Sequence, residues 1–230
     1  MNRYKMRTFG ILLVLMPLLI VLSWTGLIVR FNYPDILREP VAAVLRKYHE
    51  GGATLTLYWA GMVAASLLIF PIVLLFARLT SPANRGLSMA AAGVGLASAT
   101  FHVLGFSRWL FAADALAAQY AGQDALSPAR QDAIETVFHA LHLYLGVTIG
   151  ETLGFATMGV WAILTAVALY RSGIIRCGIA ALSVGSGLGI LSGMLEWAGW
   201  PIAVEINAYA YQLWLLIIAY VGILFIVRGK

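Results

Sequence analysis

Charged residues are scarce in this chain of 230 residues. Asp, Glu, Lys and Arg make up only 11% of it, whereas soluble domains contain about 25% charged residues. Hydrophobic residues make up 61%, and the mean hydropathy is +0.87. A soluble domain of this size has too little interior to bury so much apolar surface. The composition therefore excludes a soluble globule and predicts a polytopic membrane protein.

Cysteine is almost absent, since Cys177 is the only one. A single cysteine excludes an intrachain disulfide, a CxxC redox motif and a metal site built from several thiolates. The net charge of +5 gives no reason to expect nucleic-acid binding, because the basic residues lie at the ends of apolar runs. Membrane topology accounts for basic residues in such places. We therefore expect a lipid bilayer around the chain and no nucleic-acid partner.

Long apolar runs are what the sequence does have. Six of them are long enough to cross a bilayer, at about residues 8–30, 54–78, 86–110, 145–170, 176–199 and 204–227. Because about 20 apolar residues span the hydrocarbon layer, we predict an all-α bundle of six transmembrane helices, forming one domain over residues 1–230. The first run is longer than a signal-peptide core of about 7–15 residues, so we interpret it as a retained span. A helix over 128–144 is expected to lead into the fourth span.

The basic residues predict the orientation of the bundle. With six spans, both termini and the loops at 79–85 and 171–175 lie on one side of the membrane. That side carries no acidic residue and the following basic ones: Arg3, Lys5, Arg7, Arg78, Arg85, Arg171, Arg176, Arg228 and Lys230. The positive-inside rule then predicts that both termini are cytoplasmic.

Three ionisable residues are expected at a similar depth on three different spans. His102, Glu151 and Glu196 each lie about 25–30 Å from the cytoplasmic arginine nearest to them, at about 1.5 Å per helical residue. This places them in the outer part of a hydrocarbon layer about 30 Å thick. Ionisable groups at such depths are costly and often functional. We therefore predict a pocket in the periplasmic leaflet, with Arg108 and Trp109 at its mouth.

The helix that leads into the fourth span adds a second pattern. Glu135, His139 and His142 are spaced i, i+4, i+7, so they share one helical face. Glu151 follows His142 by nine residues and joins this face only if the helix bends, which Gly146 or Gly150 could permit.

Imidazoles and carboxylates together are typical of metal and haem sites. His102 with His139 or His142 could hold a single haem, such as haem b, in a membrane redox system. A divalent zinc, copper or iron ion is the other cofactor that these side chains suit. The candidate metal ligands are His102, Glu135, His139, His142, Glu151 and Glu196.

Two other functions stay open. The chain could be an accessory subunit that packs against a larger membrane complex, with its polar residues completing an interface. It could also be a zinc-dependent hydrolase, because three histidines near a membrane surface resemble the arrangement in ceramidase-like enzymes. The Ser and Asp partners of those enzymes cannot be identified here, and the sequence does not decide whether the protein is an enzyme.

The middle of the chain resembles a known family. The run FSRWLFAADALAAQY, followed after a polar stretch by ETVFHALHLYLGVTIGETLG, is similar to a family of six-span bacterial membrane proteins classed as a domain of unknown function. The resemblance covers mainly residues 101–161. Its matching features are Arg108-Trp109, the helix with Glu135, His139 and His142, and Gly150-Glu151. It implies a six-helix fold and a bacterial inner membrane, and it implies no activity.

The predicted orientation can be tested with reporter fusions. A reporter fused after Lys230 should be active only if it works in the cytoplasm, because the C-terminus is predicted to lie there. A fusion in the loop at 111–132 should give the opposite result. A C-terminal reporter that is active only in the periplasm would contradict the orientation.

Overall fold

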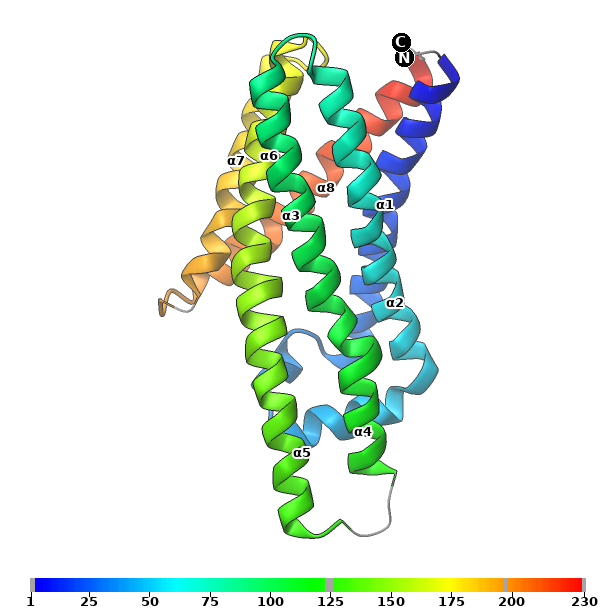
Figure 1. The fold of residues 1–230 in the computed structure, drawn as a ribbon, viewed down its shortest axis with the longest axis vertical. Helices are drawn as coiled ribbons and strands as arrows, with labels where there is room; N and C mark the ends of the chain where they lie inside the picture. The colour runs from blue at the N-terminus through cyan, green and yellow to red at the C-terminus, as the bar shows by residue number, and fades with distance from the viewer. Residues whose placement is uncertain (1–2, 123–125, 197, 229–230) are drawn as a thin grey trace.

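The computed structural model describes residues 3–122, 126–196 and 198–228. Most of these residues are helical, and none of them forms a strand. Six helical segments are long and apolar enough to cross a membrane: Met6–Phe31, Val41–Thr80, Arg85–Ala121, Pro128–Arg171, Cys177–Leu195 and Ile202–Val227. This confirms the predicted all-α, six-span class. Both chain termini lie at the same end of the bundle (Figure 1), as an even number of spans requires.

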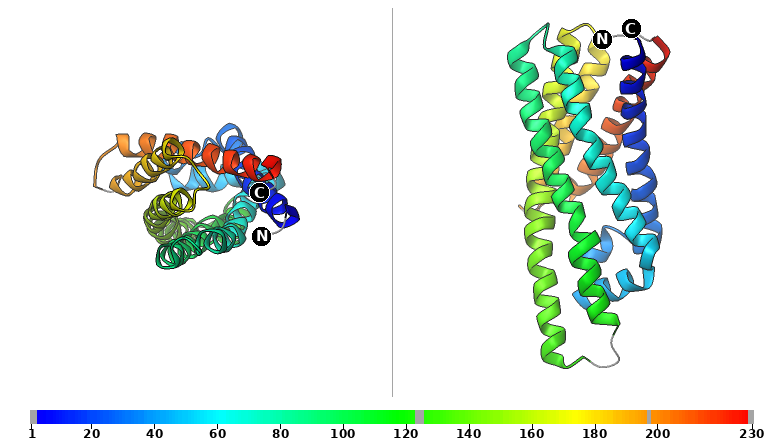
Figure 2. Two further views of the ribbon diagram at one scale, coloured as in Figure 1. Left: turned by 90° about the horizontal axis from the view of Figure 1, so that it is seen from above. Right: turned by 45° about the vertical axis from the view of Figure 1, so that its right-hand side comes forward.

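The elements follow one another in this order: α1 (Arg3–Phe31), η1 (Asp35–Arg38), α2 (Val41–Thr80), α3 (Arg85–Arg108), η2 (Trp109–Ala113), α4 (Asp114–Ala121), α5 (Pro128–Leu141), η3 (His142–Leu153), α6 (Gly154–Arg171), α7 (Cys177–Ser192), η4 (Gly193–Leu195) and α8 (Ile202–Arg228). Neighbouring spans pack in the order α1, α2, α3, α6, α7 and α8, and α8 returns to α1. The six spans therefore form a closed ring, which Figure 2 shows from above and from the side.

Besides Val41–Thr80, which is kinked at Gly52, two helical segments are much longer than a membrane is thick. Arg85–Ala121 has 37 residues and Pro128–Arg171 has 44, which correspond to roughly 55 and 65 Å of helix. Figure 1 shows their α4 and α5 ends extending past the turn between α7 and α8, away from the termini. The predicted third and fourth spans thus continue as helix beyond the bilayer, on the side predicted to be periplasmic.

The chain between α1 and α2 folds back against this extension. Tyr33 and Ile36 are buried there, at 7% and 4% exposure. Farther along, α2 changes direction at Gly52, whose φ of 51° is a conformation that favours glycine. The first part of α2 therefore lies across the end of the bundle, and the second part crosses the membrane. Together these segments cover the ends of α1 and α3 with protein.

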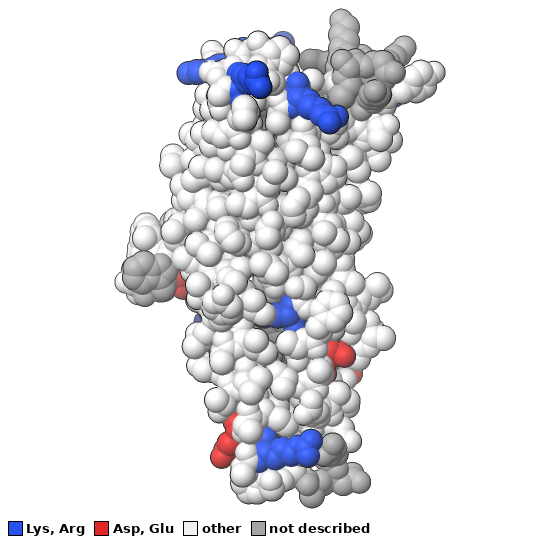
Figure 3. Space-filling model, in the orientation of Figure 1, with Lys and Arg blue, Asp and Glu red and all other residues white. Residues whose placement is uncertain are grey.

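Charge is divided between the two ends of the molecule. On the face drawn in Figure 3, the end that carries the termini shows basic groups without acidic ones, whereas the other half shows both acidic and basic groups. The surface between the two ends is largely uncharged, as a lipid-facing surface should be. The distribution agrees with the sequence pattern from which the orientation is predicted.

Glycines let α3 and the helix η3–α6 approach closely. A Cβ added to Gly150 would lie 3.2 Å from the Cα of Gly105, and one added to Gly154 would lie 3.3 Å from the His102 ring. On the other side of the bundle, a Cβ on Gly189 would lie 2.5 Å from the Cβ of Ala210. Gly150 and Gly189 therefore both lie at close helix–helix contacts, which small residues permit.

Leucine at either of these two positions should destabilise the protein. Gly150→Leu and Gly189→Leu force a side chain into backbone or Cβ atoms, and such overpacking costs about 1–3 kcal/mol. The melting temperature in detergent should fall by roughly 3–10 °C. Gly93→Leu and Gly185→Leu are the controls, because a Cβ there meets nothing within 4 Å. Equal melting temperatures for test and control variants would disprove the packing argument.

Candidate functional site

A buried arginine stands at the centre of the outer half of the bundle. Arg108, the last residue of α3, is 8% exposed and is the only buried Lys or Arg among the side chains that the structure describes. Its Nη1 donates to the Gly105 carbonyl at 2.6 Å, and its guanidinium carbon lies 5.2 Å from the Trp109 ring centroid. Nη2 is buried and has no hydrogen-bond partner in the described part of the chain. The Tyr33 hydroxyl lies beside the guanidinium, but Nη2 has no acceptor at hydrogen-bond distance among the described residues.

The facing helix makes room for the guanidinium with a glycine. A Cβ added to Gly146 would lie 2.7 Å from Nη2 of Arg108, so the guanidinium occupies the place of a side chain at that position. Gly146, Gly150 and Gly154 oppose Arg108, Gly105 and His102 in antiparallel register. We call this contact the α3–η3 seam.

Stacked aromatic rings form one wall beside Arg108. The rings of Trp59 and Trp109 stack 4.8 Å apart at an angle of 8°, and the Tyr48 ring stacks 5.6 Å from that of Trp109. The Tyr48 hydroxyl donates to the Trp109 carbonyl at 2.6 Å. The indole Nε1 atoms of both tryptophans are buried and have no acceptor in the described part of the chain. Two neutral donors therefore accompany the charged one.

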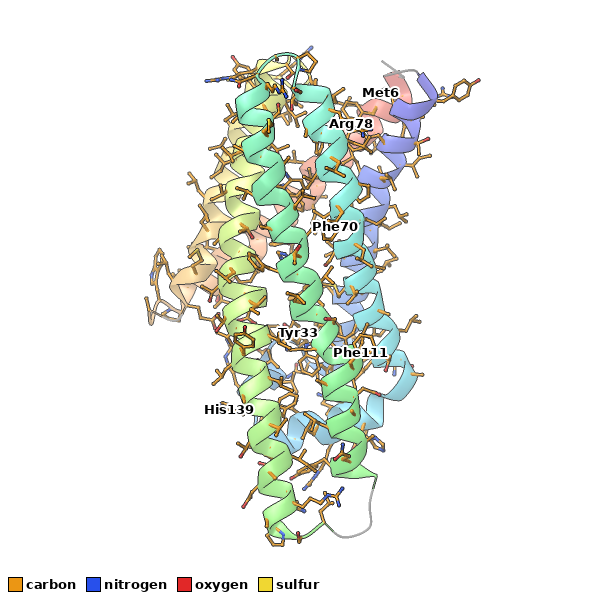
Figure 4. All side chains as sticks on the ribbon, viewed as in Figure 1. Met6, Tyr33, Phe70, Arg78, Phe111 and His139 are labelled. Carbon is orange, nitrogen blue, oxygen red and sulfur yellow. The ribbon has the colours of Figure 1, made fainter. Side chains whose placement is uncertain are left out.

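The hydroxyl of Tyr33 also lies near Arg108. Figure 4 shows it between α3 and the helix that contains α5 and α6. Burial raises the pKa of the Tyr33 hydroxyl, the nearby Glu151 carboxylate raises it further, and Arg108 beside it acts in the opposite direction. The hydroxyl therefore stays protonated at neutral pH, and its surroundings include both the Arg108 and the Glu151 charge.

Segment η3 is a π-helix, and this explains how His142 and Glu151 reach the same side. Its i→i+5 geometry is also followed by the side chains of Thr148 and Thr152, which donate to the Leu143 and Val147 carbonyls at 3.0 and 2.9 Å. A π-helix has more residues per turn than an α-helix, so nine residues make about two turns.

Glu151 therefore joins the face of His142 without the bend that we expected at a glycine. Both side chains lie close enough to Arg108 to interact electrostatically with its guanidinium. Each is half-buried, and the His142 ring stacks on Phe138 at 6.3 Å. The His142 Nδ1 is buried and without a partner in the described residues. Short π-helical segments occur frequently at functional sites.

His102 is separated from the other predicted histidines. Its Nδ1 lies 2.8 Å from the Ser98 carbonyl and donates to it, so Nε2 accepts from the Tyr211 hydroxyl at 3.1 Å. Both ring nitrogens therefore have partners. His102 also packs against Gly154, which follows His142 by twelve residues on the same helix. The structure does not bring His102 together with His139 or His142.

The remaining predicted ligands are Glu135, His139 and Glu196. Glu135 accepts a hydrogen bond of 2.6 Å from the Tyr120 hydroxyl, and His139 is exposed. Glu196 is exposed too, with its Oε1 3.8 Å from Nη2 of Arg38. The described residues include no group of three or more His, Cys, Asp and Glu side chains placed to hold a metal ion.

Arg108 and Trp109 were expected at the pocket mouth, and both are buried instead. Helix continues past them into η2 and α4, and Tyr33 and the first part of α2 cover them from the side. Sequence reasoning missed Trp59 and Tyr33 altogether, because an aromatic residue in an apolar run or a loop carries no distinct signal. The adjacent Arg-Trp pair inside a long helical run was the available clue.

Comparisons with known proteins identify the family of this chain. A search of the curated proteins and a search of the solved structures returned no significant match. The model of the family described as "Domain of unknown function (DUF4386)" matches residues 8–227. The match extends beyond the resembling region, residues 101–161, and takes in all six spans. The chain therefore belongs to the DUF4386 family of domains of unknown function.

Proposed function

We propose that this membrane protein binds an anionic ligand at Arg108, in the half of the bundle away from its termini. The proposal includes the predicted orientation, in which this half lies in the periplasmic leaflet of a bacterial inner membrane. The observation that carries it is the buried Nη2 of Arg108, which has no hydrogen-bond partner in the described part of the chain. A buried charged donor without an acceptor is costly, and a bound anion removes that cost.

The chemistry around Arg108 supports oxygen acceptors on the ligand. The unpartnered groups of Arg108, Trp59 and Trp109 are all N–H donors, and donors are matched by acceptor oxygens. A guanidinium is planar and suits the geometry of carboxylate and phosphate oxygens. The stacked indole rings beside it provide an apolar wall. A carboxylate or phosphate group fits this set of donors.

A metal ion or haem at the histidines is the competing possibility. The unpartnered Nδ1 of His142 favours it, with His139 near enough to interact. The positive charge of Arg108 lies close to His142 as well and opposes a cation there. The anion is therefore the proposal, and a bound metal or haem is tested as its rival.

The test is the thermal stability of the purified protein with and without added anions. We expect at least one carboxylate or phosphate compound to raise the melting temperature by several degrees. Saturation at about 100 times Kd stabilises a protein by about 2.7 kcal/mol. Arg108→Gln should lose this response. Arg78→Gln is the matched control, because Arg78 is an exposed arginine in α2, near the opposite end, and it should respond like the wild type.

Two results would contradict the proposal. One is an equal response of the wild type and Arg108→Gln to every anion tested. The other is a metal or a haem absorption band in the purified protein that disappears in His142→Ala and is unaffected in Arg108→Gln. If Arg108→Gln does not fold, Arg108→Lys replaces it, because lysine keeps the charge and loses the planar donor geometry.

A further inference from the structure

Arg108 lies in the α3–η3 seam, where the backbones of the two facing helices are in close contact. Gly105, Gly146 and Gly150 line it with backbone alone, and the guanidinium lies against Gly146. Arg108 keeps 8% of its surface exposed. A ligand at this exposed part would approach from the side of the bundle.

The depth of the seam matches the outer boundary of the membrane. Arg108 is the twenty-fourth residue of the helix that begins at Arg85. This length corresponds to about 35 Å, compared with a hydrocarbon layer about 30 Å thick. Lipid head groups lie at that level. Leu104 and Phe111, four residues before and three after Arg108, are exposed apolar side chains against which a lipid chain could lie.

The charges limit the head group to one negative charge. Arg108 is the only buried Lys or Arg among the described side chains, and Glu151 lies close to it. A head group with two charges would leave at least one negative charge without compensation in a medium of low dielectric constant. A single negative charge is balanced by the guanidinium when the Glu151 carboxyl is protonated.

We infer that the ligand is an amphiphile of the outer leaflet with a singly charged oxyanion head, a carboxylate or a phosphodiester. Its head contacts the exposed part of Arg108 at the α3–η3 seam from the side of the bundle, and its apolar chain stays in the lipid. This inference rests on the proposed function, since it specifies which anion occupies the Arg108 site and how it enters.

Four probes separate the elements of the inference in thermal-shift titrations of the detergent-purified protein. Dodecanoate and phosphatidylglycerol carry one charge and a chain, butyrate carries the same head as dodecanoate almost without a chain, and dodecyl phosphate carries two charges at pH 8.5. We expect dodecanoate or phosphatidylglycerol to stabilise the protein, and whichever does so identifies the head. Butyrate and dodecyl phosphate should each bind at least tenfold more weakly.

The seam is tested by Gly146→Ala. The added Cβ would lie 2.7 Å from Nη2 of Arg108 and must displace the guanidinium, so the affinity for the stabilising amphiphile should fall at least tenfold. Gly93→Ala on α3 is the control, because its Cβ meets nothing. If Gly146→Ala does not fold, a photoreactive fatty acid on the wild-type protein in lipid nanodiscs replaces it. Its label should map to residues 101–112 or 142–153.

The outcomes distinguish this inference from the proposed function. Equal binding of butyrate and dodecanoate, tighter binding of dodecyl phosphate, or a label elsewhere in the chain would overturn the inference and leave an anion site at Arg108. An absence of any response to any of the four probes, with no difference between wild type and Arg108→Gln, would overturn both.

Discussion

Burying one guanidinium is the constraint that shapes the outer half of this bundle. An arginine stays charged in a protein, so Arg108 must be stabilised by the groups around it. The Gly105 carbonyl accepts one N–H, the Trp109 ring faces the cation, and Glu151 lies close by. Gly146 keeps the space free on the opposite helix. The glycine seam, the aromatic wall and the π-helix η3 all adapt the fold to this one group, and Nη2 is the donor that they leave unsatisfied.

Polar side chains occupy three levels along the long helices, and the levels differ in how complete they are. At the deepest level His102 has a partner on each ring nitrogen, which is typical of a structural histidine. At the outermost level Glu135 and Tyr120 satisfy each other. Only the middle level, around Arg108, combines a buried charge with several unpartnered polar atoms. Unsatisfied groups of this kind call for an explanation in any folded protein, and a ligand with acceptor oxygens provides one.

The fold was predictable because it follows from the lengths of apolar runs, whereas the site depends on contacts between distant segments. His102 satisfies its Nε2 with a hydroxyl 109 residues away, which no spacing along the chain indicates. Glu151 joins the face of His142 because η3 is π-helical, while counting at the α-helical period places it half a turn away. Arg108 was expected at the mouth of the pocket, and it is buried because the segment with Tyr33 folds back over it. Counting residues along each helix predicted only that the polar residues lie in the outer half of the bundle.

Native mass spectrometry of the protein released from its own membrane tests the central claim most directly. The account predicts that the wild type and Arg78→Gln retain one singly charged amphiphile per chain, and that Arg108→Gln loses it. The same bound molecules on all three proteins would contradict the claim that Arg108 forms an anion site.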